Sequence, residues 1–261
     1  MQDFIFYKNT KISFSTRGKG TAVVLLHGFL ENISMWKAVT EVLSKRNRVI
    51  AIDLLGHGQT ECLGYVHSME LMADAVAAVL KHLRIRRTII IGHSMGGYVA
   101  LAFAEKNIEK IKGFCLMNST SLADDEERKL LRSRANKLVP QNFNNMVQLS
   151  FANLFSEESG ILFKEEKEAA IQEALKTSLQ GYIACQEGMR IRPNRAQVLQ
   201  NLSCEKLSII GKKDPVLELA TSIKEANKLN MKTEVFNDGH MSHIENKEAL
   251  ITAFQQFVKS C

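Results

Sequence analysis

Short, continuous apolar runs alternate with helix-like patterns along most of the chain. Runs of this kind are typical of strands in a parallel sheet, because helices cover both faces of such a sheet and bury the strands between them. Residues with helical spacing separate the runs, for example at 71–83 and 247–258. The pattern therefore predicts an α/β fold with a mostly parallel central sheet flanked by helices. The predicted parallel strands are 21–26, 48–52, 88–91, 111–117, 206–210 and 233–236.

One long segment breaks this alternation. Between residues 120 and 195 the apolar residues keep helical spacing, and no strand-like run is found. The segment begins where a predicted strand ends, and the carboxyl ends of parallel strands are where such sheets bind ligands. We therefore expect a core made of 1–119 and 196–261, and an inserted all-helical cap at 120–195. At the start of the chain, 4–7 and 11–15 predict an antiparallel pair at one edge of the sheet.

The net charge of +6 does not by itself indicate a nucleic-acid partner. The basic excess is scattered over the first part of the chain, mostly where loops and helix ends are expected, whereas a nucleic-acid site gathers its charges on one face. No apolar run is long enough to span a membrane. The five cysteines are widely spaced and form no C-x-x-C pair, which suits a reducing compartment. We expect a cytoplasmic protein with no nucleic-acid or membrane partner, and the sequence indicates no oligomeric state.

The segment Gly92-His93-Ser94-Met95-Gly96-Gly97 follows a predicted strand and precedes a predicted helix at 94–106. It fits the pattern G-x-S-x-G in the strand–turn–helix context that gives this pattern its meaning. The small neighbours allow a sharp, strained turn that lifts the serine hydroxyl above the sheet. Ser94 is therefore the candidate nucleophile.

A serine hydroxyl is a weak nucleophile at its normal pKa, so it needs a base and a group that orients the base. In folds with this turn, the acid and then the histidine follow the serine along the chain. Asp214 follows the predicted strand 206–210, and His240 follows 233–236. His243 lies three residues further on, but Gly239 directly precedes His240 and leaves its loop free to turn back. We expect Ser94, Asp214 and His240 to form a catalytic triad.

These motifs together resemble the α/β-hydrolase fold family, specifically carboxylesterase-like serine hydrolases with a helical cap. The resemblance extends over nearly the whole chain and is specific for the fold rather than for the substrate. The motifs that carry it are Leu26-His27-Gly28-Phe29, Asp53-Leu54-Leu55-Gly56-His57-Gly58, the Ser94 turn, Arg192-Pro193-Asn194-Arg195, Gly211-Lys212-Lys213-Asp214 and Gly239-His240.

The resemblance implies an oxyanion hole made by the backbone N–H groups of Phe29 and Met95. It also implies a cofactor-free, metal-free reaction on a small-molecule carboxylic ester, through an acyl-enzyme on Ser94. We expect small or medium uncharged acyl groups and structural roles for His27, Asp53 and His57. The large apolar residues of the cap are the candidate substrate-binding residues: Phe143, Met146, Phe151, Phe155, Tyr182 and Met189.

Other activities of the family remain open. Its dehalogenases and epoxide hydrolases use an aspartate as nucleophile, so Ser94 argues against both. Its menaquinone-pathway lyases carry an arginine four residues after the nucleophile, where this chain has Tyr98. That difference weakens the lyase hypothesis, although Arg190, Arg192 and Arg195 could still form an anion site. A carbon–carbon bond hydrolase shares the same triad, and a non-catalytic small-molecule receptor is the least favoured alternative.

Overall fold

Eight strands form one twisted sheet in the computed structural model, which describes residues 2–261 and so leaves only Met1 of the predicted core outside it. The strand order is β1-β2-β4-β3-β5-β6-β7-β8. β2 pairs antiparallel with both β1 and β4, and every later pairing is parallel. The predicted mostly parallel sheet with an antiparallel edge is confirmed. The strands are β1 (Gln2–Tyr7), β2 (Thr10–Arg17), β3 (Ala22–Leu26), β4 (Arg48–Ile52), β5 (Thr88–His93), β6 (Ile111–Met117), β7 (Glu205–Gly211) and β8 (Lys232–Phe236).

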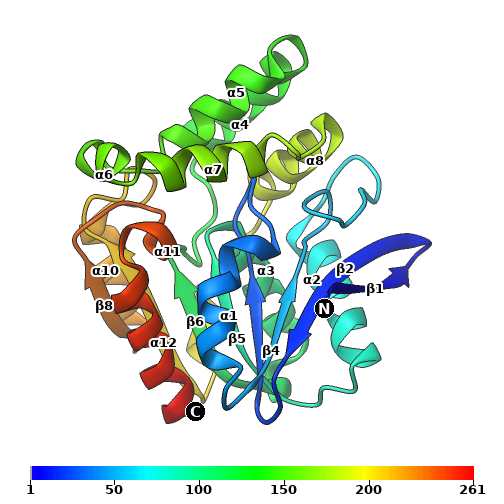
Figure 1. Cartoon of the computed structure of the whole chain (residues 1–261), viewed down its shortest axis with the longest axis vertical. Helices are drawn as coiled ribbons and strands as arrows, with labels where there is room; N and C mark the ends of the chain where they lie inside the picture. Colours follow the sequence, from blue (N-terminus) through cyan, green and yellow to red (C-terminus); the bar gives the residue numbers. More distant parts are fainter. Residues whose placement is uncertain (1) are drawn as a thin grey trace.

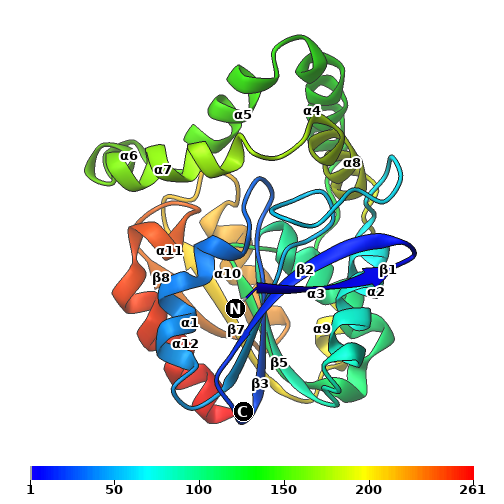
Figure 2. The ribbon, with the colours of Figure 1, turned by 45° about the vertical axis from the view of Figure 1, so that its right-hand side comes forward.

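Both faces of the sheet are covered, which explains the continuous apolar runs. Along β3, Val24 and Leu26 join the core on one face, whereas Val23 and Leu25 join the core on the other. This is the two-residue alternation of an extended strand. In Figure 2 the β1–β2 hairpin projects from the edge opposite β8. The core helices are η1 (Ile33–Trp36), α1 (Lys37–Leu43), α2 (Met69–His82), α3 (Met95–Lys106), η2 (Ile108–Lys110), α9 (Ala196–Asn201), α10 (Leu219–Lys228), α11 (Ser242–Glu245) and α12 (Lys247–Ser260).

The segment between β6 and α9 is helical, as expected. Its helices lie beyond the carboxyl ends of the parallel strands and cover that end of the sheet (Figures 1 and 2). Side-chain oxygens of Asp125, Ser156 and Ser178 accept backbone N–H groups at the starts of three of these helices, as expected for N-caps. The helices are α4 (Glu126–Leu138), η3 (Val139–Gln141), α5 (Phe143–Ala152), α6 (Glu157–Leu162), α7 (Lys164–Ala174) and α8 (Leu179–Arg190).

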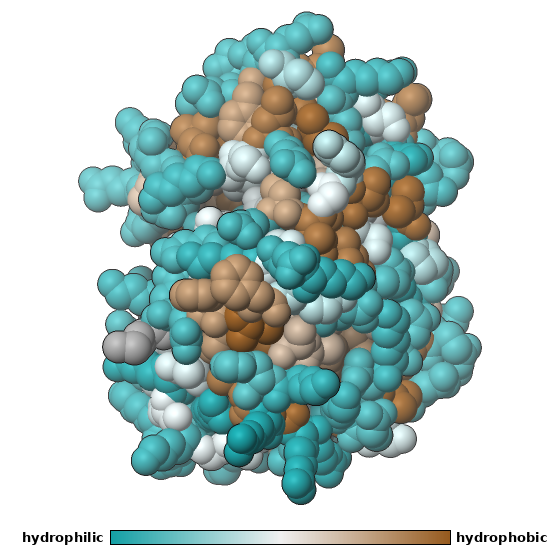
Figure 3. Space-filling model, turned by 90° about the vertical axis from the view of Figure 1, so that its right-hand side faces the viewer, coloured by the Kyte–Doolittle hydropathy of each residue, from teal (hydrophilic) through white to brown (hydrophobic). Residues whose placement is uncertain are grey.

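A third apolar cluster joins these helices to the core. Phe151 and Tyr182 from the helical segment pack in one cluster with Leu30 and Met241, which belong to core loops. Other apolar side chains of the segment stay exposed, and Figure 3 shows brown surface among teal in the upper part of the molecule, where these helices lie. The exposed ones include Leu130, Leu131, Leu138, Leu149, Ile161 and Leu162.

Within residues 2–261, no helix combines the length and the apolar character that crossing a bilayer requires.

Candidate active site

The turn between β5 and α3 holds Ser94 in a strained backbone conformation. Its φ is 49° and its ψ is −116°, a region that residues with a side chain rarely occupy. The backbone N–H of Ser94 donates to Met117 O over 2.9 Å, and its carbonyl accepts from Gly97 N over 2.9 Å. A Cβ atom at Gly96 would overlap the backbone of β3, so only glycine allows this close approach. Ser94 is thereby fixed at the end of the sheet, where α3 begins.

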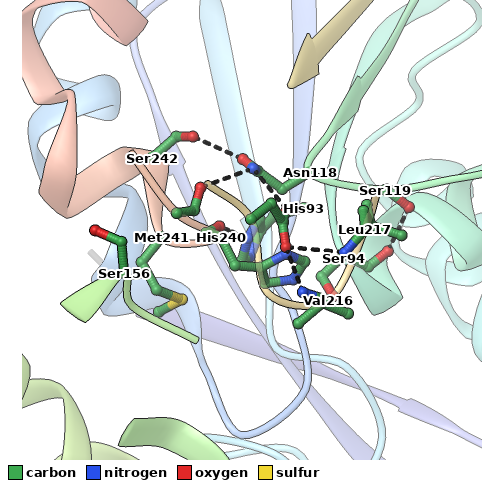
Figure 4. A network of polar contacts seen from close by, with 12 residues as sticks. His93, Ser94, Asn118, Ser119, Ser156, Val216, Leu217, His240, Met241 and Ser242 are labelled. Carbon is green, nitrogen blue, oxygen red and sulfur yellow. Dashed lines mark hydrogen bonds and ion pairs between the residues drawn. The ribbon is translucent and has the colours of Figure 1, made fainter. Parts of the chain in front are cut away.

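His240 and Asp214 form a buried hydrogen-bonded pair beside this turn. His240 Nδ1 lies 2.7 Å from Asp214 Oδ2. The other carboxylate oxygen, Oδ1, accepts from the backbone N–H groups of Val216 over 2.8 Å and Leu217 over 3.1 Å. Figure 4 shows these contacts converging next to Ser94. The loops after β7 and β8 therefore bring together two side chains that lie 26 residues apart in the sequence.

The protonation states of this pair follow from its partners. Burial opposes ionisation of Asp214, but the charge of His240 and the hydrogen bonds from His240, Val216 and Asn118 outweigh it and lower the pKa of the carboxyl. Because an ionised carboxylate can only accept, His240 Nδ1 carries the proton. The second ring nitrogen, Nε2, is then the basic one. This is the tautomer that a general base beside a serine requires.

Asn118 braces the acid and the loop of the histidine at the same time. It follows β6, and its φ of 45° places it in the left-handed region. Its Nδ2 donates to Asp214 Oδ2 and to Gly239 O, both over 3.2 Å. Its Oδ1 accepts from the Ser242 hydroxyl over 2.7 Å. Its place at a strand end was the only sequence signal for this residue, and no role was predicted for it.

Ser94 and His240 line a common small cavity of about 100 Å³ under the helical segment. We call it the Ser94 cavity. Apart from those two residues, it is lined by Phe29, Leu30, Glu31, His93, Tyr98, Arg132, Ser150, Leu154, Met189 and Val216. A larger cavity of about 670 Å³ lies between α7 and α1 and does not include Ser94. Glu31 and Leu30 line both, so the two cavities are neighbours.

Most of the predicted substrate-binding residues pack rather than line the Ser94 cavity. Of the six, Met189 lines it, and Phe151 lines the larger neighbouring cavity. Phe155 and Tyr182 belong to the buried apolar cluster between the helices and the core, and Phe143 and Met146 pack against that cluster. The sequence showed which residues are large and apolar but not which way each helix turns them. Arg132, Ser150, Leu154 and Val216 line the cavity and were not predicted.

The predicted oxyanion-hole groups belong to the loop after β3 and to the start of α3. Among residues 2–261, the backbone N–H groups of Phe29 and Met95 have no hydrogen-bond acceptor. Met95 is the first residue of α3, and Phe29 lines the Ser94 cavity. The preceding residue, Gly28, is held by its own N–H, which donates to Glu31 Oε2 over 2.7 Å.

Glu31 and His93 form a buried ion pair that joins three loops of the site. His93 Nδ1 lies 2.6 Å from Glu31 Oε2, and its Nε2 lies 3.0 Å from the carbonyl oxygen of His240. Only a protonated imidazole has two N–H groups to donate to two acceptors. Burial disfavours both charges, but the attraction and the hydrogen bond between Glu31 and His93 outweigh this effect. The pKa of Glu31 is therefore lowered to about 2, and the pKa of His93 is raised. Glu31 accepts from the Gly28 N–H, and His93 directly precedes Ser94 and contacts the His240 carbonyl. The ion pair therefore joins the three loops that carry these residues.

We expect Glu31→Gln to lower the free energy of unfolding most in the pH range where Glu31 and His93 are both charged. The stability contributed by the Glu31 carboxylate is complete above pH 4.5 and is lost as the pH falls toward 2. That of His93 is complete below pH 6.5 and is lost as the pH rises through its raised pKa. The variant should therefore be less stable by about 3–5 kcal/mol near pH 5 to 6, the usual cost of breaking a buried ion pair.

Urea unfolding of both proteins across this pH range checks the prediction. The difference between them should shrink at high pH, where His93 loses its proton in the original protein. Glu173→Gln is a matched control, because the Glu173 side chain is 39% exposed and that of its partner Lys176 is 66% exposed. A stability difference that stays constant from pH 3 to 9 would show that Glu31 and His93 are not paired as charges.

His27, His57 and His243 have partners other than Asp214. His27 Nε2 accepts from Leu54 N over 2.9 Å, and His57 Nε2 accepts from Leu30 N over 3.1 Å. Burial lowers the pKa of His57 to about 3, so this ring is neutral at physiological pH. His243 lies on α11 with its Nε2 3.4 Å from Glu31 Oε1. It is His240, therefore, and not His243, that faces Asp214.

Asp53 and the three arginines near residue 192 also have partners within the protein. Asp53 accepts backbone N–H groups from Ile33 and Gln59, which braces the turn after β4, as expected. Arg190 pairs with Glu187, Arg192 with Asp124, and Arg195 with Glu70 and Glu105. The three arginines thus do not form one common anion site.

The parallel sheet and the strand–Ser94–helix turn define an α/β protein with a nucleophile elbow. The model of the alpha/beta hydrolase fold family matches residues 21–247, so the chain belongs to that family. The predicted family and fold class are confirmed.

The chain is also similar to known structures and to curated proteins. The structure of a thermophilic esterase from Thermogutta terrifontis, with malate bound, has a TM-score of 0.93 and 29% identity, and the match covers 99% of this chain and 98% of that one. A putative 2-succinyl-6-hydroxy-2,4-cyclohexadiene-1-carboxylate synthase of Bacillus subtilis is 34% identical over 119 residues, 43% of each protein. An uncharacterized protein of Mycobacterium bovis is 35% identical over 113 residues, which is 43% of this chain. The match spans only 33% of that mycobacterial protein.

Proposed function

We propose that this protein is a serine hydrolase that cleaves carboxylic esters of small acyl groups. The observation that carries the proposal is the Asp214–His240 pair, whose histidine lines one cavity with a serine held on a strained turn. An ionised, buried acid that holds one ring nitrogen leaves the other free to take a proton from the serine. The similarity to an esterase of Thermogutta terrifontis supports the same reaction.

In the proposed reaction, Ser94 Oγ attacks the ester carbonyl carbon while His240 Nε2 takes the hydroxyl proton. The carbonyl oxygen becomes an oxyanion that accepts hydrogen bonds from Phe29 N–H and Met95 N–H. The intermediate collapses as the alcohol leaves with the proton from His240, and an acyl-enzyme remains. Water then attacks the acyl carbon, His240 takes a proton from it and returns it to Ser94, and the free acid departs.

We propose that residues 120–195 act as a cap that closes this site. The segment supplies Arg132, Ser150, Leu154 and Met189 to the Ser94 cavity, so it shapes the space beside the proposed nucleophile. Closing the site excludes bulk water and strengthens the electrostatic interactions within it.

All five cysteines are unpaired, which supports a reducing compartment such as the cytoplasm.

We expect turnover to fall steeply as the acyl chain of the ester grows. A cavity of about 100 Å³ has room for roughly three water-sized groups, at about 30 Å³ each. Typical pockets for larger ligands are about 300–1,000 Å³. In a series of 4-nitrophenyl esters, kcat/KM should peak between acetate and butyrate and fall at least about tenfold by octanoate, because the longer chain has to displace packed side chains.

Equal or better turnover of long-chain esters would contradict the proposed acyl preference. Ester hydrolysis itself is tested by identifying the products. Release of an acid and an alcohol in equal amounts distinguishes an esterase from a lyase or a carbon–carbon bond hydrolase with the same triad.

A further inference from the structure

A charge cluster with one carboxylate and two guanidinium groups lies beside the Ser94 cavity. Asp124 precedes α4, Arg132 lies on α4, and Arg192 follows α8. Asp124 Oδ2 is 2.6 Å from Arg132 Nε, and Asp124 Oδ1 is 2.8 Å from Arg192 Nη1. The side chains of Asp124, Arg132 and Arg192 are 0%, 16% and 3% exposed. The cluster therefore holds a formal charge of +1 in a largely buried place.

Among residues 2–261, no carboxylate other than Asp124 forms an ion pair with Arg132 or Arg192. Glu31 lines the same cavity, but its own charge is balanced by His93. Glu225 accepts from the Thr120 hydroxyl and from the backbone of Ser121, and it forms no ion pair among residues 2–261. A buried charge without a counterion is costly, so an anion that reaches this cluster gains from completing it.

Arg132 is the member of the cluster that lines the Ser94 cavity. Its Nε donates to Asp124, and its Nη1 donates to Gln186 Oε1 over 2.7 Å. Among residues 2–261, its Nη2 has no acceptor. Two of the three guanidinium nitrogens thus hold the planar group in place, which leaves the third for a ligand at little cost in side-chain entropy. Arg192 is unsuited to this role, because its guanidinium carbon lies 3.9 Å from the centre of the Tyr98 ring and it is almost fully buried.

We infer that the Ser94 cavity takes esters whose short acyl chain ends in a carboxylate, and that Arg132 binds this carboxylate. The inference rests on the proposed ester hydrolysis and specifies its substrate class. The cavity is small, so a group that contacts Arg132 and a carbonyl that contacts Ser94 belong to one short chain. Leu154, Met189 and Val216 line the same cavity and supply apolar contacts for the methylene groups between the two ends.

This substrate class differs from the uncharged acyl groups expected from the sequence. That expectation rests on the large apolar residues of the predicted cap. The sequence does not show that two arginines share Asp124, because the pairing depends on how α4 and α8 pack together.

The test compares two methyl esters on the full-length protein. One is monomethyl succinate, and the other is its neutral analogue, in which an isopropyl group replaces the carboxylate. We expect kcat/KM for monomethyl succinate to exceed that for the neutral analogue by at least about tenfold. In Arg132→Gln this ratio should fall by about 10–100-fold, the usual effect of losing a hydrogen bond between two charged groups. Arg132→Lys should restore part of the ratio, because it keeps the charge but not the planar geometry.

Arg134→Gln is the matched control, because Arg134 lies on the same helix but is exposed. It removes the same charge from α4 and should keep the original ratio. Circular dichroism checks folding, and labelling with a fluorophosphonate counts active sites in each variant. If Arg132→Gln does not fold, the ratio measured for the unmodified protein decides.

The outcomes separate the two proposals. A ratio of one or less in the unmodified protein, together with turnover of the neutral ester, overturns the inference and leaves the ester hydrolase in place. An Arg132→Gln variant that keeps the full ratio overturns the inference as well. If neither ester is hydrolysed and Ser94 is not labelled, the proposed function fails, and the inference fails with it.

Discussion

The Ser94→Ala variant is expected to lose about 10⁴–10⁶-fold in kcat on short-chain esters. Deleting a triad nucleophile in other serine hydrolases has effects of this size, and the remaining activity comes from the oxyanion hole and from substrate binding. In this protein the hydroxyl sits on a turn whose φ is 49°, so the fold stores strain at the one residue that is expected to attack the ester. The variant should also lose all labelling by a fluorophosphonate, because the probe forms its bond with the serine oxygen.

Steady-state kinetics on 4-nitrophenyl butyrate and mass spectrometry of the labelled protein check this prediction. Ser150→Ala is a suitable control, because Ser150 lines the same cavity but has no histidine partner among residues 2–261. It should keep its labelling at Ser94 and activity within about tenfold of the original. A probe adduct on Ser150, or an active Ser94→Ala variant, would contradict the assignment of the nucleophile.

A loss of similar size is expected for His240→Ala. Without the imidazole, nothing removes the proton from Ser94, and the buried Asp214 carboxylate also loses its hydrogen-bond partner. Because members of a triad act as a unit, the double variant of Ser94 and His240 should be scarcely slower than either single variant. Pre-steady-state kinetics should show that acylation itself is slowed. In that step the histidine takes the proton of Ser94 and then gives it to the leaving alcohol.

The neighbouring His243 is the matched comparison for His240. Both rings are buried, but His243 Nε2 lies 3.4 Å from Glu31, whereas His240 Nδ1 lies 2.7 Å from Asp214. We expect His243→Ala to keep activity within about tenfold while losing some stability. Circular dichroism and thermal unfolding of both variants distinguish a catalytic defect from a folding defect. If His243→Ala is inactive and well folded while His240→Ala is active, the two assignments are reversed.

The sheet and the triad candidates were predictable because their signals are local. A strand buried on both faces reads as a continuous apolar run, and the run ending at residue 91 is directly followed by the Ser94 turn. Parallel strands all end at the same edge, so residues just after separate runs, such as Asp214 and His240, are expected to meet. The structure places these two in hydrogen-bond contact.

The lining of the cavity was not predictable in the same way. Tyr182 and Phe151 read as pocket candidates because they are large and apolar, yet they pack in the cluster that joins the helical segment to the core. Which side of a helix faces a cavity depends on how neighbouring helices cross, and helical spacing shows only that one side is apolar. Arg132 gave no signal, because a charged residue on a helix is most often a solvated one.

The sequence by itself determined the order of strands and helices, the turn that carries Ser94, and the strand ends that carry Asp214 and His240, because each depends on residues close together in the chain. Only the tertiary structure decided the partners that lie far apart. It brought Glu31 to His93 and placed Asn118 between Asp214 and Gly239. It also placed Arg132 in the same cavity as Ser94, with one guanidinium nitrogen that has no acceptor among residues 2–261. The physical reason is that charges and hydrogen bonds act over a few ångströms in space, and the packing of helices and loops sets those distances.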